Sequence, residues 1–201
     1  PEPVPFADLA AMSGLPKSTV SRLLSSLERN GLVQRTAEGH AVPGAAITDY
    51  ALSLRSEDEL VRLAQPHLDH LGDATGETIN LAVPFGGEVR QIAQVDSTFM
   101  LGAVNWLDRS VPLHCSALGR VFLAYGAPLP AGRLARMTDR TVTSRSDLQR
   151  ALDTVRERGY AVVDSELEPG LVAIAAPIRS ADGSVVAAVS VSGPSLRLTP
   201  K

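Results

Sequence analysis

The sequence predicts an α+β protein made of a small helical unit and a larger domain in which helices pack on an antiparallel sheet. Two observations support this class. Residues 6–29 show a helical period in two short segments, and residues 76–192 alternate strand-like and helical segments separated by glycine turns. With 201 residues the chain can bury a core in each part. The predicted boundaries are 1–43 for the first unit, 44–56 for a linker helix and 57–201 for the second domain.

The first unit is predicted to be a winged helix-turn-helix. A short helix begins at Asp8 and ends at Gly14, which suits the left-handed position after a helix. Pro16 stands in the first turn of the next helix, where its missing N–H costs nothing, and Gly31 follows the end of that helix. Residues 32–42 then read as a β-hairpin, the wing.

The second helix has two faces of opposite character. One face carries Val20, Leu23, Leu24 and Leu27 at helical spacing. The other face carries serines and arginines and no carboxylate, which suits the major groove of DNA; the alternative is an ordinary solvated helix face. On this basis we expect the following contacts with double-stranded operator DNA: Lys17, Ser18, Thr19, Ser21, Arg22, Ser25, Arg29, Arg35 and His40.

The second domain is predicted from changes of period along the chain. Amphipathic segments indicate helices, and segments rich in Val, Ile and Thr indicate strands. The predicted helices are 57–75, with Pro66 inside it, 116–125, with Ser116 as its N-cap, and 146–158, which ends at Gly159. At most a short helix is expected at 132–137. The predicted strands are 78–83 and 89–95, which Gly86 and Gly87 join as a hairpin, and then 100–104, 160–163, 172–178 and 185–192.

Composition excludes several classes of protein. Hydrophobic residues at 44% and charged residues at 20% are typical of a soluble globular protein, and the net charge of −3 means that any DNA contact must come from a local face. No apolar run reaches the roughly 18 residues of a membrane span. Cys115 is the single cysteine, so no internal disulfide is possible, which suits the cytoplasm. No cofactor is expected.

Four segments together resemble one family. LAAMSGLPKSTVSRLLSSLERNGLVQR (9–35) is similar to the winged helix of the IclR-type transcriptional regulators, and VPLHCSALGRVFLAY (111–125), RERGYAVVDSELEPGLVAIAAPI (156–178) and VVAAVSVSGPSLRLTP (185–200) are similar to their effector domain. The resemblance implies a DNA-binding regulator controlled by a small molecule in a GAF-like C-terminal domain. It also implies a homodimer or homotetramer. Relative to the family, we expect the chain to be cut at both ends.

A candidate effector site lies in the second domain. Ser190 and Ser192 share one face of a strand, and Ala117, Leu118 and Gly119 open a helix whose free N–H groups attract anions. The alternative without a ligand is that the hydroxyls of Ser190 and Ser192 form hydrogen bonds with neighbouring backbone groups. The resemblance implies that the SVSGP strand lines the effector cavity, so we expect an organic acid or aromatic metabolite there. The expected apolar wall is Met100, Ala103, Trp106, Leu118 and Ala173, and the expected polar end is Asp164, Ser190 and Ser192.

The sequence also offers features of an enzyme, of a metal site and of a protein–protein adaptor. An enzyme could use His114 and Cys115, but neighbours on an extended segment point to opposite faces and cannot pair. Asp164, Glu166 and Glu168 alternate as a cluster would, but no histidine stands at ligand spacing, and Glu166 is more typical of a surface charge. We therefore expect no enzyme and no metal. A protein–protein adaptor built on the winged helix remains an alternative.

Overall fold

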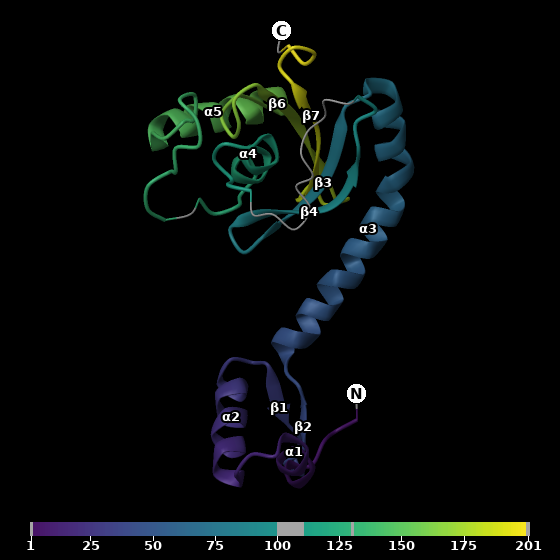
Figure 1. Cartoon of the computed structure of the whole chain (residues 1–201), viewed down its shortest axis with the longest axis vertical. Coiled ribbons are helices and arrows are strands. Elements are labelled where there is room, and N and C mark those ends of the chain that lie inside the picture. Colours follow the sequence, from purple (N-terminus) through teal and green to yellow (C-terminus); the bar gives the residue numbers. More distant parts are fainter. Residues whose placement is uncertain (1, 100–110, 130, 200–201) are drawn as a thin grey trace. The chain divides into compact units, whose positions relative to one another are not determined.

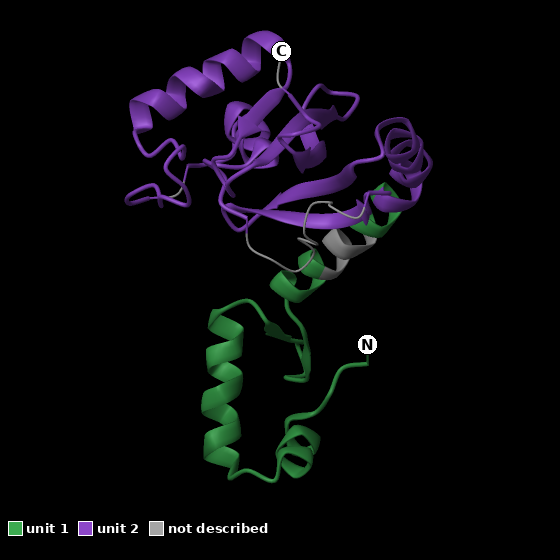
Figure 2. Ribbon diagram, turned by 45° about the horizontal axis from the view of Figure 1, so that its top comes forward, with its two compact units in different colours: residues 1–60 green, residues 61–201 purple. Residues whose placement is uncertain are grey.

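The computed structural model describes residues 2–99, 111–129 and 131–199, with the backbone alone for 51–55. The chain divides into two compact units, Pro1–Leu60 and Val61–Lys201 (Figures 1 and 2). One helix contributes residues to both units, and each unit has its own buried cluster. The strand expected at 100–104 falls outside the described residues.

The first unit has the predicted helix-turn-helix and ribbon. Helix α1 (Phe6–Ser13) ends at Gly14, whose φ of 64° is the left-handed conformation that the sequence predicted, and helix α2 (Lys17–Arg29) follows. Strands β1 (Val33–Arg35) and β2 (Ala41–Pro43) pair antiparallel. The turn chemistry therefore placed every element of this unit correctly to within a few residues.

The core of the first unit uses only half of the apolar stripe predicted on α2. Val20 and Leu24 are buried with Ala10 of α1. Leu23 and Leu27 are 50% and 38% exposed, although the helical period grouped them with the other two. The period shows which residues share a face, but two helices and a short ribbon are too few to cover the whole stripe within the described chain.

The link between the two units is one helix rather than the two that were predicted. Helix α3 (Ala45–Thr75) runs without a break through the expected boundary between 54 and 57 and contains Pro66. Proline removes one backbone hydrogen bond but lets the turns on either side continue. Because Arg55 and Ser56 carry no helix-breaking chemistry, nothing in the sequence stops the helix at the expected boundary.

A five-stranded antiparallel sheet forms the second unit. The strands are β3 (Thr78–Phe85), β4 (Glu88–Val95), β5 (Ala161–Asp164), β6 (Leu171–Arg179) and β7 (Val185–Pro194). Their order across the sheet is β4-β3-β7-β6-β5. Gly86 and Gly87, both at positive φ, close the β3–β4 hairpin as predicted.

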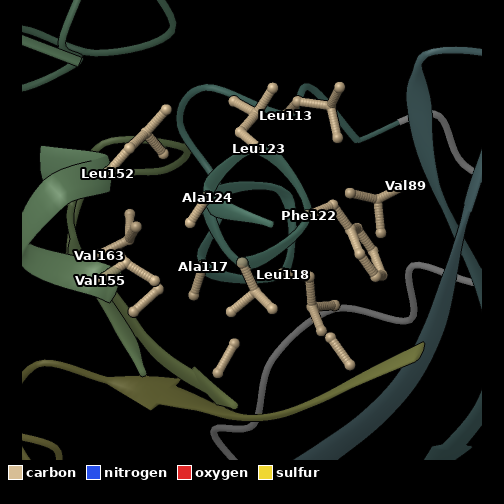
Figure 3. Close-up of a cluster of buried hydrophobic side chains, with 14 of the residues drawn as sticks. Val89, Leu113, Ala117, Leu118, Phe122, Leu123, Ala124, Leu152, Val155 and Val163 are labelled. Atoms are coloured by element: carbon tan, nitrogen blue, oxygen red, sulfur yellow. The ribbon is translucent and has the colours of Figure 1, made fainter. Parts of the chain in front are cut away.

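Helices α4 (Ala117–Ala124) and α5 (Arg145–Arg158) build the main core with the sheet. Every residue of α4 is buried. Figure 3 shows α4 nearly end-on, surrounded by buried side chains that include Leu152 of α5, Val163 of β5 and Val89 of β4. The short helix allowed at 132–137 does not form. The position of α4, deep in the core, decides where the candidate site lies.

The last part of α3 packs against the sheet at a glycine. A methyl group at Gly72 would approach Val95 Cγ1 to 2.9 Å and Ile79 Cγ1 to 3.8 Å, so this helix and the β3–β4 hairpin meet closely.

None of the helices in the described parts of the chain combines the length and the apolar character needed to span a membrane.

Candidate functional site

Helix α2 presents an exposed polar face of the predicted composition. Lys17, Ser18, Thr19, Ser21, Arg22, Ser25 and Arg29 are all exposed. Within the described residues, Lys17 and Arg22 form no ion pair and no side-chain hydrogen bond. Their positive charges are therefore available to an external anion.

The other two residues predicted to contact DNA lie on the ribbon beside this helix. Arg35 at the end of β1 is paired with Glu28 of α2, with 2.8 Å between Arg35 Nε and Glu28 Oε1. This ion pair is partly exposed, and such pairs contribute little to stability, so it can open at low cost. His40 is half-buried just before β2. The nine predicted residues thus lie on two neighbouring elements of one unit.

A cavity lies between the N-terminal end of α4 and one face of the sheet. It has about 450 Å³ of atom-free space, counted together with its opening to solvent. Five predicted residues line it: Ala117, Leu118, Ala173, Ser190 and Ser192. Ala117, Leu118 and Val163, which are labelled in Figure 3, contribute to both the core and the cavity wall.

Strand register explains why the two serines face this cavity. Ser190 lies opposite Asn80 of β3 and Ala175 of β6, while Ser192 lies opposite Thr78 and Ala173. Both serines are buried, yet neither hydroxyl has a hydrogen-bond partner within the described chain. The structure therefore does not support the alternative that they bond to neighbouring backbone.

The start of α4 is open toward the cavity. Ser116 caps the helix as predicted, because its hydroxyl accepts from the Gly119 N–H at 3.2 Å and donates to the Pro112 carbonyl at 2.8 Å. The N–H groups of Ala117 and Leu118 find no acceptor in the described part of the protein. They carry the positive end of the helix dipole into a cavity wall.

Two predicted cavity residues lie elsewhere. Asp164 does not line the cavity; it pairs with Arg140 at 2.9 Å and accepts a hydrogen bond from Ser165. Because side chains alternate along β5, Val163 faces the cavity and Asp164 faces away. Gly119 is a packing residue, since a Cβ there would lie 2.4 Å from Leu113 Cα.

Three further members of the predicted apolar wall, Met100, Ala103 and Trp106, lie outside the described residues.

Glu166 is buried, so its interpretation as a surface charge is wrong. Its carboxylate accepts from Arg120 Nη2 at 2.6 Å and from the Val142 N–H at 3.0 Å. Arg120 also donates through Nε to the His114 carbonyl at 3.0 Å. The pair joins α4, which forms one wall of the cavity, to the turn after β5.

Sequence reasoning missed several cavity residues, chiefly Asn80, Gln91, Val111, Cys115, Ser116, Leu167 and Leu171. Asn80 and Gln91 stand within strands that were predicted, but a polar residue in a strand is usually assigned to a solvated face. Asn80 is 2% exposed. The one available signal was that Asn80 is a polar residue between Ile79 and Leu81, in a strand whose other residues after Thr78 are apolar.

Cys115 and His114 do not form a catalytic pair. His114 Nε2 lies 2.8 Å from the Ala135 carbonyl, and burial raises the pKa of the Cys115 thiol to about 11. A protonated thiol is a poor nucleophile. Asp164, Glu166 and Glu168 do not gather into a metal cluster, and no such cluster occurs among the described residues.

Comparison with known proteins identifies the family. Residues 1–37 match the IclR helix-turn-helix domain, and residues 53–201 match the C-terminal domain of bacterial transcriptional regulators of the IclR type. The chain belongs to the IclR family. It is 35% identical over 203 residues to the HTH-type transcriptional regulator BhcR of Paracoccus denitrificans, covering 96% of this chain and 72% of that protein.

Solved structures of the IclR family have the same fold. IclR of Thermotoga maritima superposes with a TM-score of 0.66 at 29% identity, covering 99% of this chain and 83% of that one. An IclR homologue of Microbacterium hydrocarbonoxydans complexed with 4-hydroxybenzoate gives 0.63 at 27% identity, covering 96% and 82%. This IclR-family chain is thus a DNA-binding transcriptional regulator with a C-terminal effector domain, and its relatives are regulators rather than enzymes.

Breaking the Arg120–Glu166 pair should destabilise the second unit strongly. Arg120→Met leaves the buried Glu166 carboxylate without its cation. In such pairs this lowers the free energy of unfolding by about 3–5 kcal/mol, which urea unfolding would measure. Replacing both partners, Arg120→Met with Glu166→Met, should recover part of this loss. The exposed pair of Arg150 with Asp147 on α5 supplies the control, and Arg150→Met there should change the unfolding midpoint little. Equal effects of the two Arg→Met changes would contradict this account.

The Cys115 thiol should titrate above the usual range in the folded protein. Thiolate absorbance at 240 nm, taken as the difference between the wild type and Cys115→Ala, should rise with a midpoint near pH 11. In urea the midpoint should fall to the ordinary value, near 9. Because the folded pKa is the higher, Cys115 adds no pH dependence below pH 9 and lowers stability as pH rises from 9 to 11. A folded midpoint at or below 9 would refute burial of the thiol.

Proposed function

We propose that this IclR-family regulator contacts operator DNA through α2 and the ribbon. The supporting observation is the pair of exposed cations, Lys17 and Arg22, that lack partners among the described residues and share a helix with small hydroxyl side chains. Arginine and serine on such a face can reach base edges and phosphates in a major groove. The remaining contacts come from Ser18, Thr19, Ser21, Ser25 and Arg29 on the helix and from Arg35 and His40 on the ribbon.

The effector is a small carboxylic acid bound in the cavity of the second unit. This rests on the hydroxyl groups of two buried serines, Ser190 and Ser192, which have no partner in the described chain and line the same cavity as Ala117 and Leu118 with their open N–H groups. A carboxylate can accept hydrogen bonds from all of these donors. Neither lysine nor arginine is among the described residues that line the cavity, and Arg120 behind the wall is already paired with Glu166. A ligand with one negative charge is therefore better matched than one with two.

Regulation is a coupling free energy between the two sites. Helix α3 contributes residues to both units, so it is the covalent route by which the effector domain can bias the DNA-binding unit. The regulator acts in the cytoplasm as a homodimer or homotetramer, which presents two winged helices to half-sites about one helical turn apart.

Arg22→Ala should weaken DNA binding and reduce its dependence on salt. DNA ligands are first selected from a random duplex library with the wild-type protein, and affinity is then measured from 50 to 200 mM salt. Loss of one phosphate contact lowers the slope of log K against log salt by roughly one. Arg150→Ala on α5 is the matched control and should leave the slope unchanged. A wild type that selects no duplex and shows no salt dependence would point to an adaptor.

Replacing Ser190 and Ser192 together by alanine should abolish acid binding while leaving DNA affinity without ligand unchanged. A thermal-shift screen of monocarboxylic acids with two to eight carbons identifies the ligands, because binding to the folded state raises the midpoint by mass action. The shift should vanish in the double variant. Ser180 and Ser184, in the exposed turn between β6 and β7, provide the matched control as a double alanine variant. A shift that survives in the Ser190/Ser192 variant would contradict the assignment of the site.

A further inference from the structure

Two amides in the wall of the effector cavity have oxygens without a hydrogen-bond partner. Asn80 is 2% exposed, and its Oδ1 is buried with no donor in the described chain. Gln91 Oε1 is likewise buried and has no hydrogen-bond donor in the described chain. Both residues line the cavity. Buried side-chain oxygens are nearly always bonded to protein, to water or to a ligand, so two such oxygens in one cavity call for an explanation.

The sheet places the two amides on the same face as the serines. Asn80 lies opposite Ser190, and Gln91 lies opposite Ala82, two residues further along β3. A register shift between Leu81 and Ala82 puts an extra residue in β4 near this point, and such a bulge re-aims the side chains around it. The amides therefore belong to a part of the cavity wall formed by β3 and β4, whereas the open N–H groups belong to α4.

The lining restricts what can pair with these oxygens. An amide oxygen accepts a hydrogen bond, so the ligand must offer a donor. A charged ammonium donor would need a counter-charge, and no aspartate or glutamate is among the described lining residues. A hydroxyl meets the requirement without charge, and it can also accept from an amide N–H. Val111, Leu118, Leu167 and Leu171 then surround the carbon skeleton.

We propose that the effector is a hydroxylated carboxylic acid, with its hydroxyl group bound by the amides of Asn80 and Gln91. This rests on the proposed function, because the acid group is assigned to the site formed by α4 and the two serines. Gln91 lies on β4, two strands away from the serines of β7, so a hydroxyl that reaches it is separated from the carboxylate along the ligand. Unhydroxylated acids of the same size bind more weakly, because they leave the amide oxygens unpaired.

The test uses pairs of acids that differ by one hydroxyl distant from the carboxylate. Suitable pairs are butyrate with 4-hydroxybutyrate, benzoate with 4-hydroxybenzoate, and 3-phenylpropionate with its 4-hydroxyphenyl analogue. Affinities for the whole chain are measured by isothermal titration calorimetry. For at least one pair, the hydroxylated acid should bind the wild type at least about tenfold more tightly.

Variants assign the preference to the amides. Asn80→Leu keeps the side-chain volume and removes the unpaired oxygen, so it should reduce the ratio of affinities to about one by weakening only the hydroxylated acid. Gln91→Leu should reduce the same ratio, and it tests the proposal even if Asn80→Leu does not fold. Gln94→Leu on the same strand is the control, because Gln94 does not line the cavity, and it should keep the ratio.

The outcomes separate the two proposals. If no acid binds the wild type, the proposed effector class is wrong, and the assignment of a hydroxyl to Asn80 and Gln91 is then wrong as well. If acids bind but both members of each pair bind equally, the hydroxyl assignment alone is wrong, as it would be if water satisfied the amides. If both Asn80→Leu and Gln91→Leu still prefer the hydroxylated acid, the hydroxyl assignment is also wrong.

Discussion

The alternation of side chains along the central strands is the constraint on which the second unit depends. On β7, Val189 and Val191 face one side of the sheet while Ser190 and Ser192 face the other. The serines lie in rows with Ala173 and Ala175 of β6, so this stretch of sheet carries small side chains. Helix α4 packs over the same face with larger ones. A cavity results because small residues leave room that a close-packed core would otherwise fill.

The buried ion pair between Arg120 and Glu166 fixes α4 relative to that face. Its cost in desolvation is offset only because both groups have further partners, namely the His114 carbonyl and the Val142 N–H. The pair is neutral as a whole, and the described residues that line the cavity in front of it carry no charged side chain. Within this described lining, the open N–H groups of α4 are then the main source of positive potential for the proposed acid. The same pair thus positions the helix and sets the polarity of the site.

Local chemistry explains what could be predicted from the sequence. Helix ends at Gly14 and Gly159, the cap at Ser116 and the turn at Gly86 depend on one or a few neighbouring residues, and each was placed correctly. The missed features depend on pairing between distant segments. Arg120 meets Glu166 across 46 residues, and Asn80 reaches the cavity only through strand register. Asp164 was misplaced by the same effect, since one residue along β5 reverses its face.

The two proposed sites work under opposite electrostatic conditions. On α2, Lys17 and Arg22 are exposed in water, where their attraction to phosphates is long in range but weakened by salt. In the cavity, the donors proposed to hold the acid are neutral and act at short range, and burial shields such hydrogen bonds from salt. Ionic strength therefore acts on the DNA contact and leaves the effector contact nearly untouched. In the proposed DNA site, a chain with a net charge of −3 attracts phosphates because exposed cations are concentrated on one helix.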